Sequence, residues 1–69
     1  MKIDRICYDV RTAAGAAVAT EWARSGDDGT PYSHEAAMER VNDRLGMSFT
    51  YPVLEEAVYE AERKLGLIL

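Results

Sequence analysis

His34 is the only histidine of the chain and the first residue whose chemistry could serve a function. An imidazole gains and loses its proton near neutral pH, so it can act as a general base or bind a metal ion. Either role needs further groups at a defined spacing, such as a Cys-x-x-Cys or a His-x-x-x-His pair. The sequence contains neither pair. We therefore expect His34 to be a partly buried residue near a helix start, and we predict no metal or other cofactor.

Cys7 is the only cysteine, so it can neither form an internal disulfide nor hold zinc alone. We expect it to be a small core residue. A lone cysteine is typical of a reducing compartment. The first residues also lack an uninterrupted apolar stretch, because Asp4 and Arg5 follow Ile3. Both observations predict a cytoplasmic location.

Glycine and proline cluster in two segments, 26–31 and 46–52. The Asp27-Asp28-Gly29 sequence resembles a fragment of a calcium loop, but the spaced ligands and the terminal glutamate of such a loop are missing. Neither cluster has a glycine pattern that binds phosphate. We interpret both as turns. With no positioned acid, base or nucleophile, the chain is predicted not to be an enzyme.

The two turns divide the chain into three amphipathic segments. Apolar residues recur at steps of three and four in each segment, which is the spacing of one helical face. We predict an all-α fold: a single three-helix domain over residues 1–69, with helices at about 4–24, 31–45 and 51–65. Thr30 and Pro31 are expected to start the second helix. The predicted core comprises Ile6, Val10, Met38, Val41, Leu45, Leu54, Val58 and Leu65.

The second and third segments share several residues when residues 30–47 are aligned with 50–67. Thr30 matches Thr50, and both segments end in Leu-Gly. Two readings remain open. The helices arose by duplication, or two amphipathic helices with the same start and stop signals converged on these matches.

A chain of 69 residues and 7.7 kDa is short for a stable monomer. Its alanine-rich uncharged stretch, Thr12–Thr20, is far below the roughly 20 apolar residues that span a bilayer. We therefore expect no membrane association. The alanines of this stretch either receive the other two helices or form the seam of a homodimer. We predict a homodimer, with these candidate self-association residues: Ala13, Ala17, Val18, Leu67, Ile68 and Leu69.

Twelve acidic residues against eight basic ones give a net charge of −4. Such a surface repels a phosphate backbone, so nucleic acid is not an expected partner. Glu35, Glu39 and Asp43 recur at every fourth position of the second helix and form a predicted acidic ridge. The ridge is either a solvated face or a surface that recognises a basic patch on a protein partner.

Trp22 is the only tryptophan and follows Glu21, where the helical register predicts a core position. The apolar stripe therefore breaks at this point. Trp22 is either an exposed interface anchor or a core residue. We expect burial, since its large apolar area is valuable in a small core, but we keep it as a candidate partner-binding residue.

These observations favour a non-enzymatic, small acidic module that binds or regulates another protein. The alternative is a helix-turn-helix-like DNA-binding regulator, which the glutamates of the third helix disfavour. The composition, with many Ala, Arg, Asp and Glu residues and only two lysines, is typical of high-GC bacterial and phage genes. It suggests a phage or bacterial accessory factor that acts on a host protein.

Overall fold

The computed structural model describes residues 8–46 and 50–67. Within these ranges the chain folds into three α-helices and contains no strand: α1 (Tyr8–Asp28), α2 (His34–Leu45) and α3 (Tyr51–Lys64). The predicted all-α, three-helix class is therefore confirmed. None of the described helices has the length and apolar character needed to cross a membrane.

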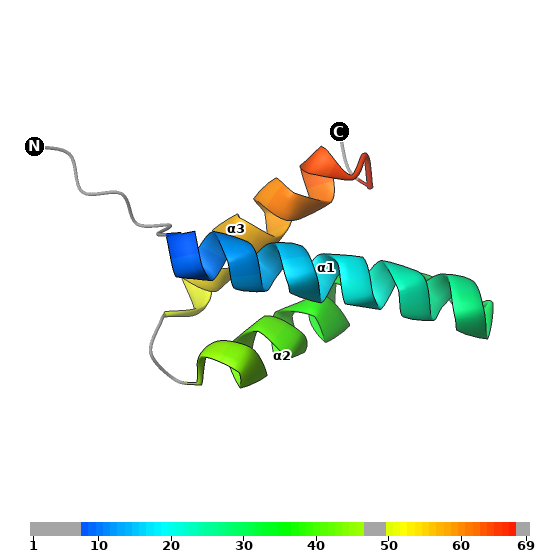
Figure 1. Cartoon of the computed structure of the whole chain (residues 1–69), viewed down its shortest axis with the longest axis horizontal. Helices are drawn as coiled ribbons and strands as arrows, with labels where there is room; N and C mark the ends of the chain where they lie inside the picture. Colours follow the sequence, from blue (N-terminus) through cyan, green and yellow to red (C-terminus); the bar gives the residue numbers. More distant parts are fainter. Residues whose placement is uncertain (1–7, 47–49, 68–69) are drawn as a thin grey trace, which may run out of the picture.

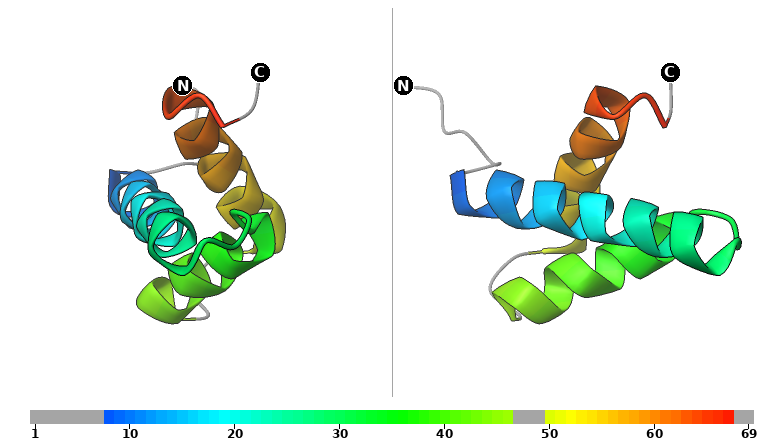
Figure 2. Two further views of the ribbon diagram at one scale, coloured as in Figure 1. Left: turned by 90° about the vertical axis from the view of Figure 1, so that its right-hand side faces the viewer. Right: turned by 45° about the vertical axis from the view of Figure 1, so that its right-hand side comes forward.

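The longest helix, α1, organises the fold (Figure 1). Both shorter helices pack against α1 more extensively than they pack against each other. Seen along its axis, α1 has α2 on one flank and α3 on another, and α3 crosses it steeply (Figure 2). The described side chains of α1 that are buried and apolar are three alanines and two valines, and these small residues let both helices approach closely.

The core lies where the three helices meet. It consists of Val10, Ala13, Ala14, Ala17 and Val18 of α1, Ala37, Met38 and Val41 of α2, and Leu54, Ala57 and Val58 of α3. The predicted core residues Val10, Met38, Val41, Leu54 and Val58 are thus confirmed, and Leu45 is half-buried against the same cluster. Ile6 and Cys7 lie outside the described residues.

The predicted core position of Leu65 is wrong, because 51% of this residue is exposed. It is the C-cap residue that follows α3, and the chain then turns through Gly66, whose φ of 79° is left-handed. The Leu67 amide donates to the Glu62 carbonyl at 2.9 Å, which closes the end of the helix. Leu67, rather than Leu65, is brought back against the core.

The start of α2 also differs from the prediction. Ser33 caps the helix, and its side-chain oxygen accepts a hydrogen bond from the Ala36 amide at 3.1 Å. The predicted cap at Thr30 is therefore wrong, and Thr30 and Pro31 belong to the connection from α1. That connection begins at Gly29, which has a φ of 70° and donates to the Ser25 carbonyl.

Candidate functional site

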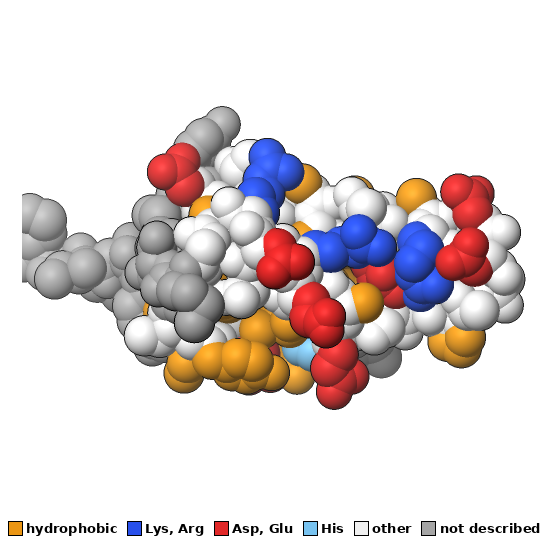
Figure 3. Space-filling model, turned by 90° about the horizontal axis from the view of Figure 1, so that it is seen from below, with side chains coloured by type: hydrophobic (Ala, Val, Ile, Leu, Met, Phe, Trp, Pro, Cys, Tyr) orange, Lys and Arg blue, Asp and Glu red, His pale blue; other side chains and the backbone are white. Residues whose placement is uncertain are grey.

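The acidic ridge is a surface feature. Glu35, Glu39 and Asp43 are all exposed along α2. Seen from below, the molecule shows a line of acidic side chains beside a row of basic ones (Figure 3). The structure thus leaves the ridge accessible to a partner.

Trp22 is 52% exposed, so the predicted burial of this residue is wrong. Glu21, one position earlier, takes the interior position that the helical register indicates, and it is fully buried. Successive residues of a helix point about 100° apart, so Trp22 is turned outward. Its ring centroid lies 6.3 Å from that of Tyr32, two residues before α2 begins. Trp22 therefore stands beside the end of α2 at which the acidic ridge starts.

The predicted self-association residues of α1 face the other two helices of the same chain. Ala13, Ala17 and Val18 are buried in the core of the single chain, because α2 and α3 cover this face of α1. Leu67 is half-buried against the same core. Ile68 and Leu69 lie outside the described residues. Self-association stays a prediction.

Glu21 is the buried centre of an ionic cluster that joins α1 to the start of α2. Arg24, one turn further along α1, donates from Nε to Glu21 Oε1 at 2.8 Å and from Nη2 to Oε2. The Ser33 amide donates to Glu21 Oε2 at 3.1 Å. Arg40 of α2 approaches Oε1 more loosely, with its Nη2 at 3.5 Å.

This cluster keeps Glu21 ionised. The hydrogen bonds from Arg24, together with the Ser33 amide and the positive charge of Arg24, lower the pKa of Glu21 from 4.5 to about 2. Burial alone would raise that pKa, so the donors outweigh desolvation. Arg24 also contacts Asp28, Thr30 and the Pro31 carbonyl. The Arg24 guanidinium thus links α1 to the segment that connects α1 with α2.

Glu62 of α3 is a second buried carboxylate, which the sequence did not lead us to expect. The Tyr32 hydroxyl donates to its Oε2 at 2.7 Å. His34 Nδ1 lies 2.9 Å from the same oxygen and acts as the second donor. His34 also stacks on Tyr59, with ring centroids 4.5 Å apart.

The contacts of Tyr32 and His34 serve to stabilise the fold. Burial, the hydrogen bond to Glu62 and the nearby carboxylates raise the pKa of Tyr32 above its ordinary value of 10. The second ring nitrogen of His34, Nε2, is buried, makes no hydrogen bond and lies 3.7 Å from Glu55 Oε2. His34 is half-buried at the first position of α2, as expected. No group of three His, Cys, Asp or Glu side chains among the described residues could hold a metal ion.

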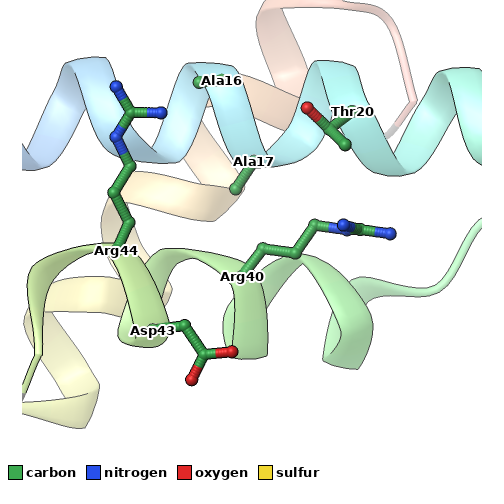
Figure 4. A pocket seen from close by; sticks show the side chains of 6 residues that line it. All are labelled: Ala16, Ala17, Thr20, Arg40, Asp43 and Arg44. Atoms are coloured by element: carbon green, nitrogen blue, oxygen red, sulfur yellow. The ribbon is translucent and has the colours of Figure 1, made fainter.

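A groove runs between α1 and α2 on the side of the basic row. Its volume is about 400 Å³, and it is lined by Ala16, Ala17, Thr20, Arg40, Asp43 and Arg44. Figure 4 shows Arg44 reaching from α2 toward α1 at the Ala16 end, whereas Arg40 extends toward the Thr20 end. The Asp43 carboxylate is turned away from α1. Small side chains on α1 leave this space open, and long cationic ones on α2 border it.

Sequence reasoning found the acidic ridge but missed both buried carboxylates as paired groups and the groove as a whole. For Glu21 a local signal existed, because an arginine follows at a helical spacing of three. For Glu62 there was none, since its partners lie 30 and 28 residues away in the chain. Searches among protein families, curated proteins and solved structures found no match to this chain.

Proposed function

We propose that this protein is a non-enzymatic binding module that recognises a basic surface on a partner protein through Trp22 and the acidic ridge. The exposure of Trp22 carries the proposal. Tryptophan is strongly enriched among the few interface residues that dominate binding energy. A small chain that leaves its only tryptophan half exposed forgoes burial that would stabilise its core.

The position of Trp22 supports a joint role with the ridge. Trp22 contacts Tyr32, and Glu35 follows Tyr32 by three residues, so the aromatic ring and the first ridge carboxylate lie at the same end of α2. Like charges one helical turn apart repel each other and slightly destabilise α2. A basic partner would relieve this repulsion and would be attracted electrostatically during encounter.

No arrangement in the fold favours the DNA-binding alternative, which stays a prediction. The helix that would enter the groove of DNA, α3, carries the exposed Glu56 and the half-buried Glu55 and Glu60. Action on a host protein likewise rests on composition alone.

Affinity capture with three baits tests the proposal: the wild type, Trp22→Ala, and a triple variant in which Glu35, Glu39 and Asp43 become glutamine. Two controls match the changes in type and exposure, Tyr51→Ala and Glu56→Gln. We expect a basic protein that the wild type and both controls retain and that both test variants lose. Added salt should weaken its retention. If all five baits retain the same proteins, the surface is not a binding site.

Fluorescence then checks the contact directly. Trp22 is the only tryptophan, so its emission reports on this position alone. Binding of the captured partner should shift the emission to the blue as the ring loses contact with water. Unchanged emission on saturation would remove Trp22 from the interface.

A further inference from the structure

We propose that the groove between α1 and α2 is a second binding site, which takes the carboxylate of an Asp or Glu side chain in a partner polypeptide. This goes beyond the proposed function, because it assigns a ligand of opposite charge to a different surface. The structural basis is a groove with two arginines and unused hydrogen-bond donors in a protein that is acidic as a whole.

The unused donors belong to Arg40 and Arg44. Arg40 Nε is buried and has no hydrogen-bond partner. Within residues 8–46 and 50–67, the Arg40 guanidinium makes only the 3.5 Å contact with Glu21, a carboxylate that Arg24 already binds with two nitrogens. Arg44 is exposed and forms no ion pair with any residue in ranges 8–46 and 50–67. Its planar fork matches a carboxylate.

The remaining lining fits the carbon atoms of an acidic side chain. Ala16 and Ala17 provide a small apolar floor, and Thr20 offers a hydroxyl. The groove, at about 400 Å³, is much larger than a single small anion requires, since a water molecule occupies only roughly 30 Å³ of liquid. It therefore has room for a short peptide segment around the carboxylate.

The charge of the lining favours a carboxylate over a phosphate. Arg40 and Arg44 border the groove, and Arg40 shares the Glu21 carboxylate with Arg24, which also pairs with Asp28. These three arginines and two carboxylates carry a net charge of +1, and the Asp43 carboxylate is turned away from α1. A single carboxylate brings the groove to neutrality, whereas a phosphate, which carries close to two negative charges at neutral pH, leaves an excess negative charge. Asp43 also belongs to the acidic ridge, so a partner could place a basic residue on the ridge and an acidic one in the groove.

Amide NMR titration of the full chain tests this site. The probe is a capped alanine peptide whose only charged group is a central glutamate, and its control is the same peptide with glutamine. We expect saturable shifts of the amides of Ala16, Ala17, Thr20, Arg40 and Arg44 with the glutamate peptide. Binding of the glutamine peptide should be at least about tenfold weaker, the loss typical of one charge-assisted pair.

Variants distinguish binding in the groove from a general attraction between the peptide and any positive charge of the protein. Arg44→Gln should weaken binding of the glutamate peptide about tenfold. Arg63→Gln, at an exposed arginine on α3, should leave the affinity for this peptide unchanged. Arg44→Lys keeps the charge but loses the fork, so an intermediate affinity is expected. Equal losses in Arg44→Gln and Arg63→Gln would overturn the site, as would shifts scattered over all three helices.

Two further measurements test for other occupants of the groove. Inorganic phosphate that binds the same amides as tightly as the glutamate peptide at equal ionic strength would overturn the assignment to a carboxylate. Shifts of these amides with protein concentration alone would assign the groove to a second copy of the chain. These titrations use no acidic-ridge variant, so a negative result for the groove is distinguishable from a negative result for the proposed function.

Discussion

Replacement of Glu21 by glutamine tests whether the ionic cluster holds the α1–α2 connection in place. A fall in the pKa of Glu21 from 4.5 to about 2 corresponds to about 3 kcal/mol of stabilisation. Water still reaches the two arginines, whose side chains are 31% and 38% exposed, and it screens part of this interaction. We therefore expect Glu21→Gln to lower the free energy of unfolding by about 2 kcal/mol at pH 7. For a chain of this length that is a fall in Tm of roughly 8–16 °C.

The pH dependence gives the sharper test, because it isolates the charge of Glu21. Its pKa is lower in the folded state than in the unfolded state, so its contribution is complete above pH 4.5 and is lost as the pH falls toward 2. Other carboxyl groups titrate in both proteins and cancel in the comparison. The difference in stability between the wild type and Glu21→Gln should therefore shrink steadily below pH 4.5.

Urea unfolding followed by circular dichroism at pH 7, 4 and 3 measures this difference. Glu39→Gln is the matched control, since Glu39 is exposed on α2 and its replacement should change the stability by less than about 0.5 kcal/mol. Equal urea midpoints for Glu21→Gln and Glu39→Gln at pH 7 would refute the reasoning. A difference that stays constant from pH 7 to pH 3 would show that the loss comes from packing and not from charge.

Two further predictions concern the core and the second carboxylate. Leu54→Ala should destabilise the fold by about 2–4 kcal/mol because Leu54 is 3% exposed, whereas Leu65→Ala should lose less than about 1 kcal/mol; urea midpoints distinguish the two. The raised pKa of Tyr32 means that its contribution to stability is present below pH 10 and is lost as the pH rises further, when the unfolded chain ionises first. Tyr32→Phe lacks this loss, so its deficit of about 1 kcal/mol at pH 8 should narrow by pH 11, and a constant deficit would contradict the assigned hydrogen bond.

The three-helix class could be predicted from the sequence because its signals are local. Apolar spacing and glycine stops act over a few residues, and the left-handed turns at Gly29, Gly46 and Gly66 follow the three helices. The choice between Thr30 and Ser33 as the cap of α2 was not local. Both residue types cap helices well, but the Ser33 amide also binds Glu21 from another helix.

The candidate site divides in the same way. The acidic ridge follows from the spacing of residues within one helix. The exposure of Trp22 does not, because it depends on a charged residue taking the interior position beside it, and that requires the tertiary partners of Glu21. The groove needs alanines of α1 and arginines of α2 to be brought together, and no pattern within either segment encodes that meeting.

Glu62 has a consequence for how α3 aligns with the rest of the fold. The other side chains that α3 packs against the core, Leu54, Ala57, Val58 and Ala61, are apolar, and apolar contacts are not directional. A slip of one turn would set Val58 opposite Tyr32 and His34 and leave the Glu62 carboxylate without its two donors. We therefore expect the paired Glu62 carboxylate to favour the observed register of α3 over its neighbours, whereas the apolar core supplies most of the contact between α3 and the other helices.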